Sequence, residues 1–429
     1  MKRIITSPRL LVVLLLISIT ASLSFAAGRT KRSSRVPQRS AVTKSRATAA
    51  ARKAKPTTKP AKTITRKTRK RGGRVVSTRL RGAKLRRVST RGAGNFVAGG
   101  PWLEPTFADS TLGDNIDGED LAVRRAAVDA LGAFNGSVVV VDPSNGRILT
   151  IVNQKVAFSN GFQPCSTIKV YAALAGLSEG VIGNGDTRQR LYGRVSMDLT
   201  DALAKSNNPY FANIGVKLGY DRMAHYARMF GLGEKAGLDI PEEQPGVFSD
   251  APPKFGGMGM MTSFGEGVKL TPLQLASLMA SLANGGTMYY LQYPRSQAEA
   301  EVMEPRVKRR LPIEQLIPEV TPGMLGATEY GTARRAGYAA DEPILGKTGT
   351  CTDRATPTHL GWFGSFNEVN GRKLAVVVLL TGGRHVNGPA ASGVAGRIYQ
   401  TLSQLRLSAL SNASLTTEEP SVDESDGSL

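Results

Sequence analysis

Histidine and cysteine are scarce in this sequence. Its 429 residues include three histidines and two cysteines. His225, His359 and His385 are isolated, and no two of them have the spacing of metal ligands. We therefore expect no metal site and no other cofactor.

Acidic residues are absent from the first 91 positions, which are strongly basic. Residues 29–91 carry 24 Lys and Arg and no Asp or Glu. From residue 92 onward the chain carries 29 Lys and Arg against 34 Asp and Glu. The formal net charge of +22 therefore describes an N-terminal appendage, and the remainder is mildly acidic.

The first 27 residues have the pattern of an export segment. A basic start is followed by an apolar run and then by the small residues Ser24, Ala26 and Ala27. Residues 10–27 are also just long enough to span a thin bilayer. We predict a signal peptide or a membrane anchor over 1–27, although the basic residues that follow oppose translocation. Either alternative makes the protein extracytoplasmic.

Residues 28–97 are predicted to be a disordered basic linker. Like charges and few large apolar side chains leave too little surface to bury against the entropy of ordering. The linker could bind an anionic membrane or wall polymers, or serve as a solvated spacer. A nucleic-acid-binding tail has a similar composition, but aromatic residues for base stacking are missing between the basic ones, so we expect no nucleic acid.

Residues 98–408 read as one globular domain, followed by an acidic tail over 409–429 that we expect to be disordered. Strands are predicted at 136–142, 147–153, 344–351, 359–366 and 373–381. Helices are predicted at 166–179, 197–206, 209–218, 221–230, 271–283, 322–333 and 388–405. This order indicates an α/β fold with an antiparallel sheet that is completed late and a large helical insertion.

A serine and a lysine at i and i+3 form the first chemical motif, Ser166-Thr-Ile-Lys169. In a helix their side chains share one face. A lysine whose pKa is lowered by burial can remove the proton of a serine hydroxyl and so create a nucleophile. The motif alone is weak, because a serine at a helix start is more often a simple N-cap.

Two further motifs follow, and each is weak alone. Ser206-Asn-Asn208 offers a hydroxyl for proton relay and an amide for orienting a substrate, but such a sequence before proline is often a turn. In Lys347-Thr348-Gly349-Thr350 the glycine permits close approach of a ligand, and the flanking side chains can hold a carboxylate. A phosphate-binding loop is excluded, because Asp341 stands where the earlier glycine would be needed.

Together the three motifs resemble the transpeptidase domain of penicillin-binding proteins, a branch of the serine β-lactamase superfamily. The likeness covers roughly residues 120–405. Its other segments are 163–180, 202–211, 263–276, 282–286 and 361–364. The resemblance implies a five-stranded antiparallel sheet flanked by helices, with a mostly helical subdomain.

The resemblance also implies roles for the motif residues. Ser166 would be acylated by a D-alanyl-D-alanine stem peptide or by a β-lactam, with Lys169 as the general base. Ser206 and Lys347 would pass the proton to the leaving amine. The acyl group would then move to a second amine in a D,D-transpeptidase, or to water in a carboxypeptidase.

The other residues of the second and third motifs would bind the substrate. By the same resemblance, Asn208 would orient the acyl side chain, and Thr348 and Thr350, beside Gly349, would bind the terminal carboxylate. The backbone amides of Ser166 and Thr350 would form the oxyanion hole.

Cys165 and Cys351 depart from the family pattern. Certain carbapenem-hydrolysing class A β-lactamases carry a disulfide between the two equivalent places, so the resemblance implies a Cys165–Cys351 disulfide. Two buried free thiols are the alternative. The resemblance also raises the alternative of a β-lactamase. Glu243 and Glu266 are candidates for its water-activating acid only because they are acidic and lie between the second and third motifs, and acidic residues are more often solvated or structural. A penicillin sensor or wall-binding protein without turnover is the non-enzymatic alternative.

Overall fold

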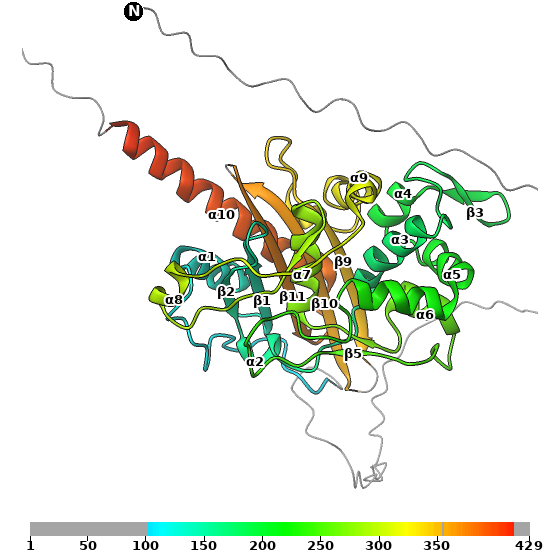
Figure 1. Ribbon diagram of the computed structural model, residues 1–429, viewed down its shortest axis with the longest axis horizontal. Helices are drawn as coiled ribbons and strands as arrows, with labels where there is room; N and C mark the ends of the chain where they lie inside the picture. Colours follow the sequence, from blue (N-terminus) through cyan, green and yellow to red (C-terminus); the bar gives the residue numbers. More distant parts are fainter. Residues whose placement is uncertain (1–101, 354–355, 370, 416–429) are drawn as a thin grey trace, which may run out of the picture. The chain divides into compact units, whose positions relative to one another are not determined.

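The protein is described by a computed structural model that covers residues 102–353, 356–369 and 371–415 (Figure 1). The predictions for residues 1–27 and 28–97 lie outside the described residues. Within these ranges no helix combines the length and the apolar composition needed to cross a membrane.

A five-stranded antiparallel sheet forms the centre of the domain. Its strands are β1 (Gly136–Val141), β2 (Ile148–Val152), β9 (Leu345–Asp353), β10 (Thr358–Val369) and β11 (Arg372–Gly382). Their order is β2-β1-β11-β10-β9, with every neighbouring pair antiparallel. This confirms the predicted sheet, in which the early hairpin is completed by the last strands of the chain.

Both faces of the sheet are covered by helices, which explains the continuous apolar runs in its strands. In β1, Val138 and Val140 face a cluster that includes α1 (Leu121–Leu131) and α10 (Gly388–Leu415). Val139 and Val141 face the opposite cluster, which includes α7 (Pro272–Ala283). Since side chains alternate along a strand, a sheet buried on both faces requires apolar residues at every position.

The remaining helices form a largely helical region on the same side of the sheet as α7, to the right in Figure 1. They are α3 (Ile168–Ser178), α4 (Leu199–Ala204), α5 (Asn208–Met229), α6 (Gly257–Phe264) and α9 (Ile317–Glu329). The smaller elements are α2 (Gln154–Ala157), α8 (Gln297–Glu301), the strand pairs β3 (Gln189–Tyr192) with β4 (Val195–Met197), β5 (Val247–Phe248) with β6 (Val268–Lys269) and β7 (Thr287–Tyr289) with β8 (Val307–Arg310), and the 3₁₀ turns η1 (Cys165–Thr167), η2 (Glu314–Leu316) and η3 (Arg334–Ala336).

Three helix boundaries differ from the sequence prediction or refine it. The predicted helices 209–218 and 221–230 are the two parts of α5, which is interrupted at Gly219, where φ is 74°. Helix α9 begins at Ile317 rather than at residue 322, because Pro318 lies in its first turn and Pro322 is tolerated inside it. Helix α10 continues to Leu415, past the boundary at 408, since residues 397–415 contain no glycine or proline to end it.

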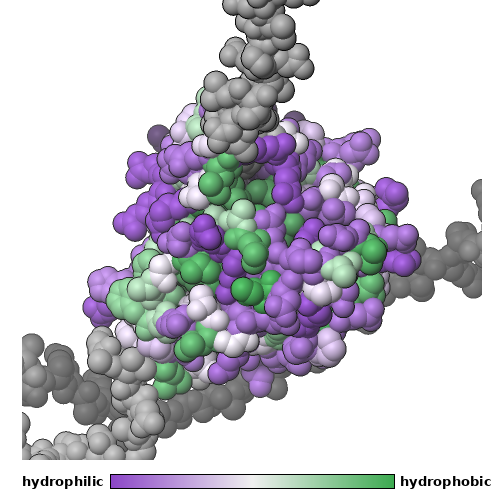
Figure 2. Space-filling view, turned by 90° about the vertical axis from the view of Figure 1, so that its left-hand side faces the viewer, coloured by the Kyte–Doolittle hydropathy of each residue, from purple (hydrophilic) through white to green (hydrophobic). Residues whose placement is uncertain are grey.

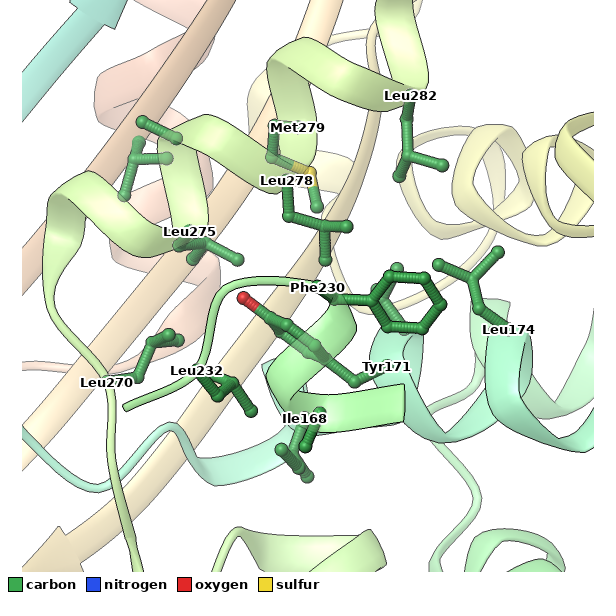
Figure 3. Close-up of a cluster of buried hydrophobic side chains, with 14 of the residues drawn as sticks. Ile168, Tyr171, Leu174, Phe230, Leu232, Leu270, Leu275, Leu278, Met279 and Leu282 are labelled. Carbon is green, nitrogen blue, oxygen red and sulfur yellow. The ribbon is translucent and has the colours of Figure 1, made fainter. Parts of the chain in front are cut away.

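Helix α3 is buried on all sides and crosses the apolar interior. Every residue from Ile168 to Leu177 is buried, and Figure 3 shows Tyr171 and Leu174 directed toward Phe230 and the leucines of α7. A helix that is apolar all round belongs inside a domain. By contrast, the surface in Figure 2 is mostly hydrophilic, with hydrophobic residues in small groups. The position of α3 is therefore set by packing on every side.

We predict that Gly396→Ala destabilises the protein by about 1–3 kcal/mol. A Cβ at this position would collide with the carbonyl of Ala336 in η3, where neither backbone can yield. The matched control is Gly393→Ala in the same helix. Its added Cβ would meet Arg335 at an ordinary 3.5 Å, so it should stabilise α10 by about 0.5–1 kcal/mol. Urea unfolding measures both, and equal midpoints for the two variants would contradict the close packing of α10 on η3.

Candidate active site

Ser166 lies in a 3₁₀ turn and not in the first turn of an α-helix. The turn η1 precedes α3, and Cys165 within it has a φ of 52°, in the left-handed region. The Thr167 hydroxyl donates a hydrogen bond of 2.7 Å to the carbonyl of Pro164. The prediction of a helix beginning at residue 166 is therefore wrong by two residues, because this local hydrogen bond favours a tighter turn.

Lys169 is fully buried, and its amine lies among four oxygen atoms. Its Nζ is 2.9 Å from Ser166 Oγ, 3.0 Å from Ser206 Oγ and 2.9 Å from the Ser206 carbonyl oxygen. The fourth contact is the side-chain oxygen of Asn208 at 2.6 Å. The i and i+3 spacing thus places the amine within hydrogen-bond distance of the serine hydroxyl.

The environment of Lys169 favours the neutral amine. Burial, together with the smaller effect of the nearby positive charge of Lys347, lowers its pKa to about 6. None of the four oxygen atoms around Nζ belongs to a carboxylate. A neutral amine beside a hydroxyl can accept its proton, which is the requirement for a general base.

The second motif forms the turn between α4 and α5. Ser206 has a φ of 56°, which lets both its carbonyl and its hydroxyl face Lys169. Asn207 caps α5 by accepting a hydrogen bond of 2.9 Å from the amide of Tyr210. Asn208, expected to orient a substrate amide, accepts a hydrogen bond from Lys169 in this structure. The motif is therefore a turn, and in the same conformation it also places Ser206 and Asn208 next to Lys169.

Strand β9 carries the third motif beside the nucleophile. Gly349 has no room for a side chain, since a Cβ would lie 2.8 Å from the Pro164 carbonyl and 3.2 Å from the Cβ of Cys165. Lys347 is fully buried, and desolvation lowers its pKa to about 7. Its amine donates to the Thr348 carbonyl at 3.1 Å. Between these two described residues, Lys347 and Ser206, the structure records no direct hydrogen bond.

The two threonines of the third motif differ in exposure. Thr348 is buried, and its hydroxyl lies 2.6 Å from that of Thr332. Thr350 is exposed, and its hydroxyl accepts a hydrogen bond of 2.7 Å from the amide of Gly388 at the start of α10. The hydroxyls of Thr348 and Thr350 thus connect β9 to the segment after α9 and to the last helix.

These residues line a cavity of about 530 Å³. Ser166, Ser206, Thr348 and Thr350 contribute to its wall. The other lining residues were not identified from the sequence: Gly331, Thr332, Arg334, Arg335 and Pro389. The pair of adjacent arginines after α9 could have indicated an anion-binding position. The sequence prediction of a helix through residue 333 did not include the turn that places them at the cavity.

Cys165 and Cys351 are joined by a disulfide in the structure, with their Cα atoms 5.5 Å apart. The bond connects the residue before Ser166 to the residue after Thr350. The same region is also held by Trp362 of β10, whose indole donates to the Gln163 carbonyl at 2.9 Å. The start of the nucleophile turn is therefore fastened to β9 and β10 by covalent and polar contacts.

The two glutamates considered as water-activating acids lie elsewhere. Glu243 is buried, and its carboxylate accepts hydrogen bonds of 2.8 Å from the amides of Ala236 and Gly237. Glu266 is exposed, and its carboxylate accepts a hydrogen bond of 3.4 Å from the side-chain amide of Gln163. Neither lines the cavity around Ser166, which agrees with a structural or solvated role for both and not with that of a water-activating acid.

The comparisons with known proteins agree with this geometry. The family model described as "Penicillin binding protein transpeptidase domain" matches residues 136–404. The chain therefore belongs to the family of penicillin-binding protein transpeptidase domains.

Among curated relatives, the chain is 29% identical over 329 residues to the peptidoglycan D,D-transpeptidase PbpA of Mycobacterium tuberculosis, covering 61% of this chain and 66% of that protein. It is 26% identical over 281 residues to penicillin-binding protein H of Bacillus subtilis, covering 53% of this chain and 39% of the relative. The chain thus spans less than two thirds of the length of these relatives.

Solved structures share the fold. Pseudomonas aeruginosa PBP2 in complex with WCK 5153 superposes with a TM-score of 0.55 at 24% identity, covering 66% of this chain and 76% of the other. Penicillin-binding protein A of M. tuberculosis, in a ceftriaxone acyl-enzyme complex, gives a TM-score of 0.54 at 24% identity, covering 65% and 78%. The architecture is therefore that of a transpeptidase domain.

We predict that the double variant Cys165→Ala/Cys351→Ala loses about 2–5 kcal/mol of unfolding free energy. The bond closes a loop with a sequence separation of 186, and its removal frees the unfolded chain. Urea unfolding of the variant is compared with that of the wild type with and without reductant. Two free thiols by mass spectrometry of the wild-type protein would refute the pairing.

Proposed function

We propose that this domain is a penicillin-sensitive serine D,D-transpeptidase that acts on peptidoglycan stem peptides through an acyl-enzyme at Ser166. The observation that carries the proposal is the buried amine of Lys169, whose pKa is lowered to about 6, at 2.9 Å from Ser166 Oγ. A hydroxyl without such a base is a poor nucleophile. The family membership and the curated relatives support the same reaction class.

In the proposed acylation step, neutral Lys169 accepts the proton of the Ser166 hydroxyl while Oγ attacks the carbonyl carbon of the penultimate D-alanine. The amides of Ser166 and Thr350 stabilise the resulting oxyanion. As the peptide bond breaks, the proton passes from Lys169 through the Ser206 hydroxyl, 3.0 Å away, to the leaving amine. The D-alanine leaves with a neutral amino group, and the acyl group remains on Ser166 as an ester.

Lys347 contributes to this step through its charge and not through a recorded contact with Ser206. Its proximity helps to keep Lys169 neutral. On β9, Thr348 and Thr350 are proposed to bind the terminal carboxylate of the donor peptide, with Gly349 allowing β9 to lie against the nucleophile turn. Asn208, held by Lys169, is proposed to orient the acyl side chain.

The fate of the acyl-enzyme separates the alternatives. Transfer to an amine forms a cross-link, whereas transfer to water makes a D,D-carboxypeptidase or, with a β-lactam, a β-lactamase. Among the described residues that line the cavity, none is acidic. Rapid hydrolysis needs a group that activates water at the ester, so this lining favours a long-lived acyl-enzyme and transfer to an amine.

We further propose that the domain works outside the cytoplasmic membrane, where stem peptides are cross-linked. Residues 1–27 would direct its export or anchor it, and the basic linker would associate with anionic membrane or wall polymers. Both assignments rest on the composition of segments outside the described residues.

We expect a fluorescent penicillin to form a long-lived adduct with the wild-type protein and none with Ser166→Ala. The ester at Ser166 should persist, because no acidic residue lines the described cavity. The control Ser144→Ala removes an exposed serine hydroxyl in the β1–β2 turn and should label normally. Rapid turnover of the penicillin would indicate a β-lactamase, and labelling of Ser166→Ala would exclude this residue as the nucleophile.

We expect the rate of penicillin acylation to rise about tenfold per pH unit below pH 6 and to level off above it. The base must be neutral, and the fraction of neutral Lys169 increases as pH rises through its lowered pKa of about 6. Stopped-flow labelling across pH 4.5–8.5 measures this profile. A rate that still rises about tenfold per pH unit up to pH 8.5, as a base with the ordinary lysine value of 10.5 would give, would contradict the buried base.

Lys169→Arg provides the companion test, because a guanidinium keeps its proton and cannot act as a base. Labelling of this variant should be lost at every pH tested. The matched control is Lys205→Arg, at an exposed lysine paired with Asp201 near the same motif. It should retain the wild-type profile.

A further inference from the structure

Two arginines at the wall of the cavity have no assigned task in the proposed reaction. Arg334 and Arg335 lie in η3 and line the same cavity as Ser166. Both are exposed, and within the described part of the chain neither guanidinium has a recorded hydrogen bond or ion pair. Elsewhere in the described domain, many arginine side chains are paired with carboxylates, as Arg124 is with Asp114 at 2.7 Å.

The backbone that carries these arginines is firmly held on both sides. On one side, Gly331 packs against the Ala204 carbonyl without room for a Cβ, and the Thr332 amide donates to that carbonyl at 3.1 Å. On the other side, Ala336 lies against Gly396 of α10. The two guanidiniums therefore extend from a fixed turn, and their flexible stems can adapt to a ligand.

The charges around the cavity favour an anion. The pKa values of Lys169 and Lys347 are lowered to about 6 and about 7, so neither amine carries a full positive charge throughout the neutral pH range. A guanidinium stays charged in proteins. The permanent positive charges of the described lining are therefore those of Arg334 and Arg335, with no acidic residue in that lining to neutralise them.

We propose that Arg334 and Arg335 form a subsite for a carboxylate of the peptide substrate other than the terminal carboxylate of the acyl donor. The inference rests on the proposed function, in which Thr348 and Thr350 already take the terminal group. The planar fork of a guanidinium matches a carboxylate in two parallel hydrogen bonds. The second carboxylate belongs either to the acyl part of the donor or to the amine acceptor.

The experiment compares matched substrates with the full-length protein. Two thioester donors carry a D-alanyl-thioglycolate group and are capped either with glutaryl, which ends in a carboxylate, or with the neutral pentanoyl group of similar length. Acceptor recognition is measured with D-alanine against D-alaninamide. Release of thioglycolate and formation of the transfer product give kcat/KM for each pair.

The expected result is a change of preference. In Arg334→Gln/Arg335→Gln, the ratio of kcat/KM for the carboxylate-bearing member over the neutral member should fall about tenfold relative to wild type, for the donor pair or for the acceptor pair. The single variants should show intermediate losses, and high salt should weaken the wild-type preference. Arg125→Gln, at an exposed arginine on α1, removes the same charge and should keep the wild-type ratios.

Three outcomes would overturn the subsite. The ratios could stay unchanged in all arginine variants, or every substrate could lose activity equally. The third is a loss of activity that occurs with the thioglycolate donors whatever their cap and disappears when the thioglycolate carboxylate is replaced by its methyl ester, which would assign the arginines to the terminal group. Failure of the wild-type protein to react with penicillin or thioesters would instead refute the proposed function.

Discussion

A primary amine buried without a neighbouring carboxylate is the constraint on which the rest of the site depends. Solvating Lys169 or pairing it with an acid would restore its proton and remove its capacity as a base. The domain keeps water away by placing α3 in the apolar interior, where Tyr171 and Leu174 pack against Phe230 and α7 (Figure 3). The amine is satisfied by neutral oxygens, which accept or share hydrogen bonds without stabilising the charged form strongly.

Holding the nucleophile in place requires a second set of contacts, directed at the turn before α3. The disulfide of Cys165, the close approach of Gly349 and the hydrogen bond from Trp362 all act within three residues of Ser166. Each fastens the turn to β9 or β10, the strands at one edge of the sheet. Packing fixes the base from one side, and the sheet fixes the nucleophile from the other.

The features of the fold and site that can be predicted from the sequence are those with a local or periodic pattern. The valine run of β1 predicts a buried strand because alternation leaves no polar face, and the i and i+3 spacing predicts that Ser166 and Lys169 meet. The left-handed backbone conformation at Cys165 and Ser206 could not be predicted from the sequence, since neither residue is a glycine. Thr332 and Arg334 reach the cavity because residues 331–332 pack against α4 and η3 packs against α10, which no local pattern encodes.

The strand order has a consequence for how the chain reaches its native state. Strand β1 lies early in the sequence, but its partner β11 is the last strand of the described residues, and the helical region lies between them in sequence. Such long-range pairing is slow to form, because a large loop must close before any contact is gained. Until β11 arrives, the Val-Val-Val-Val edge of β1 is open to other chains. A partly folded chain in which β11 has not yet paired would expose the unpaired edge of β1, to which other chains could bind. Protection from aggregation therefore depends on rapid pairing of the C-terminal strands.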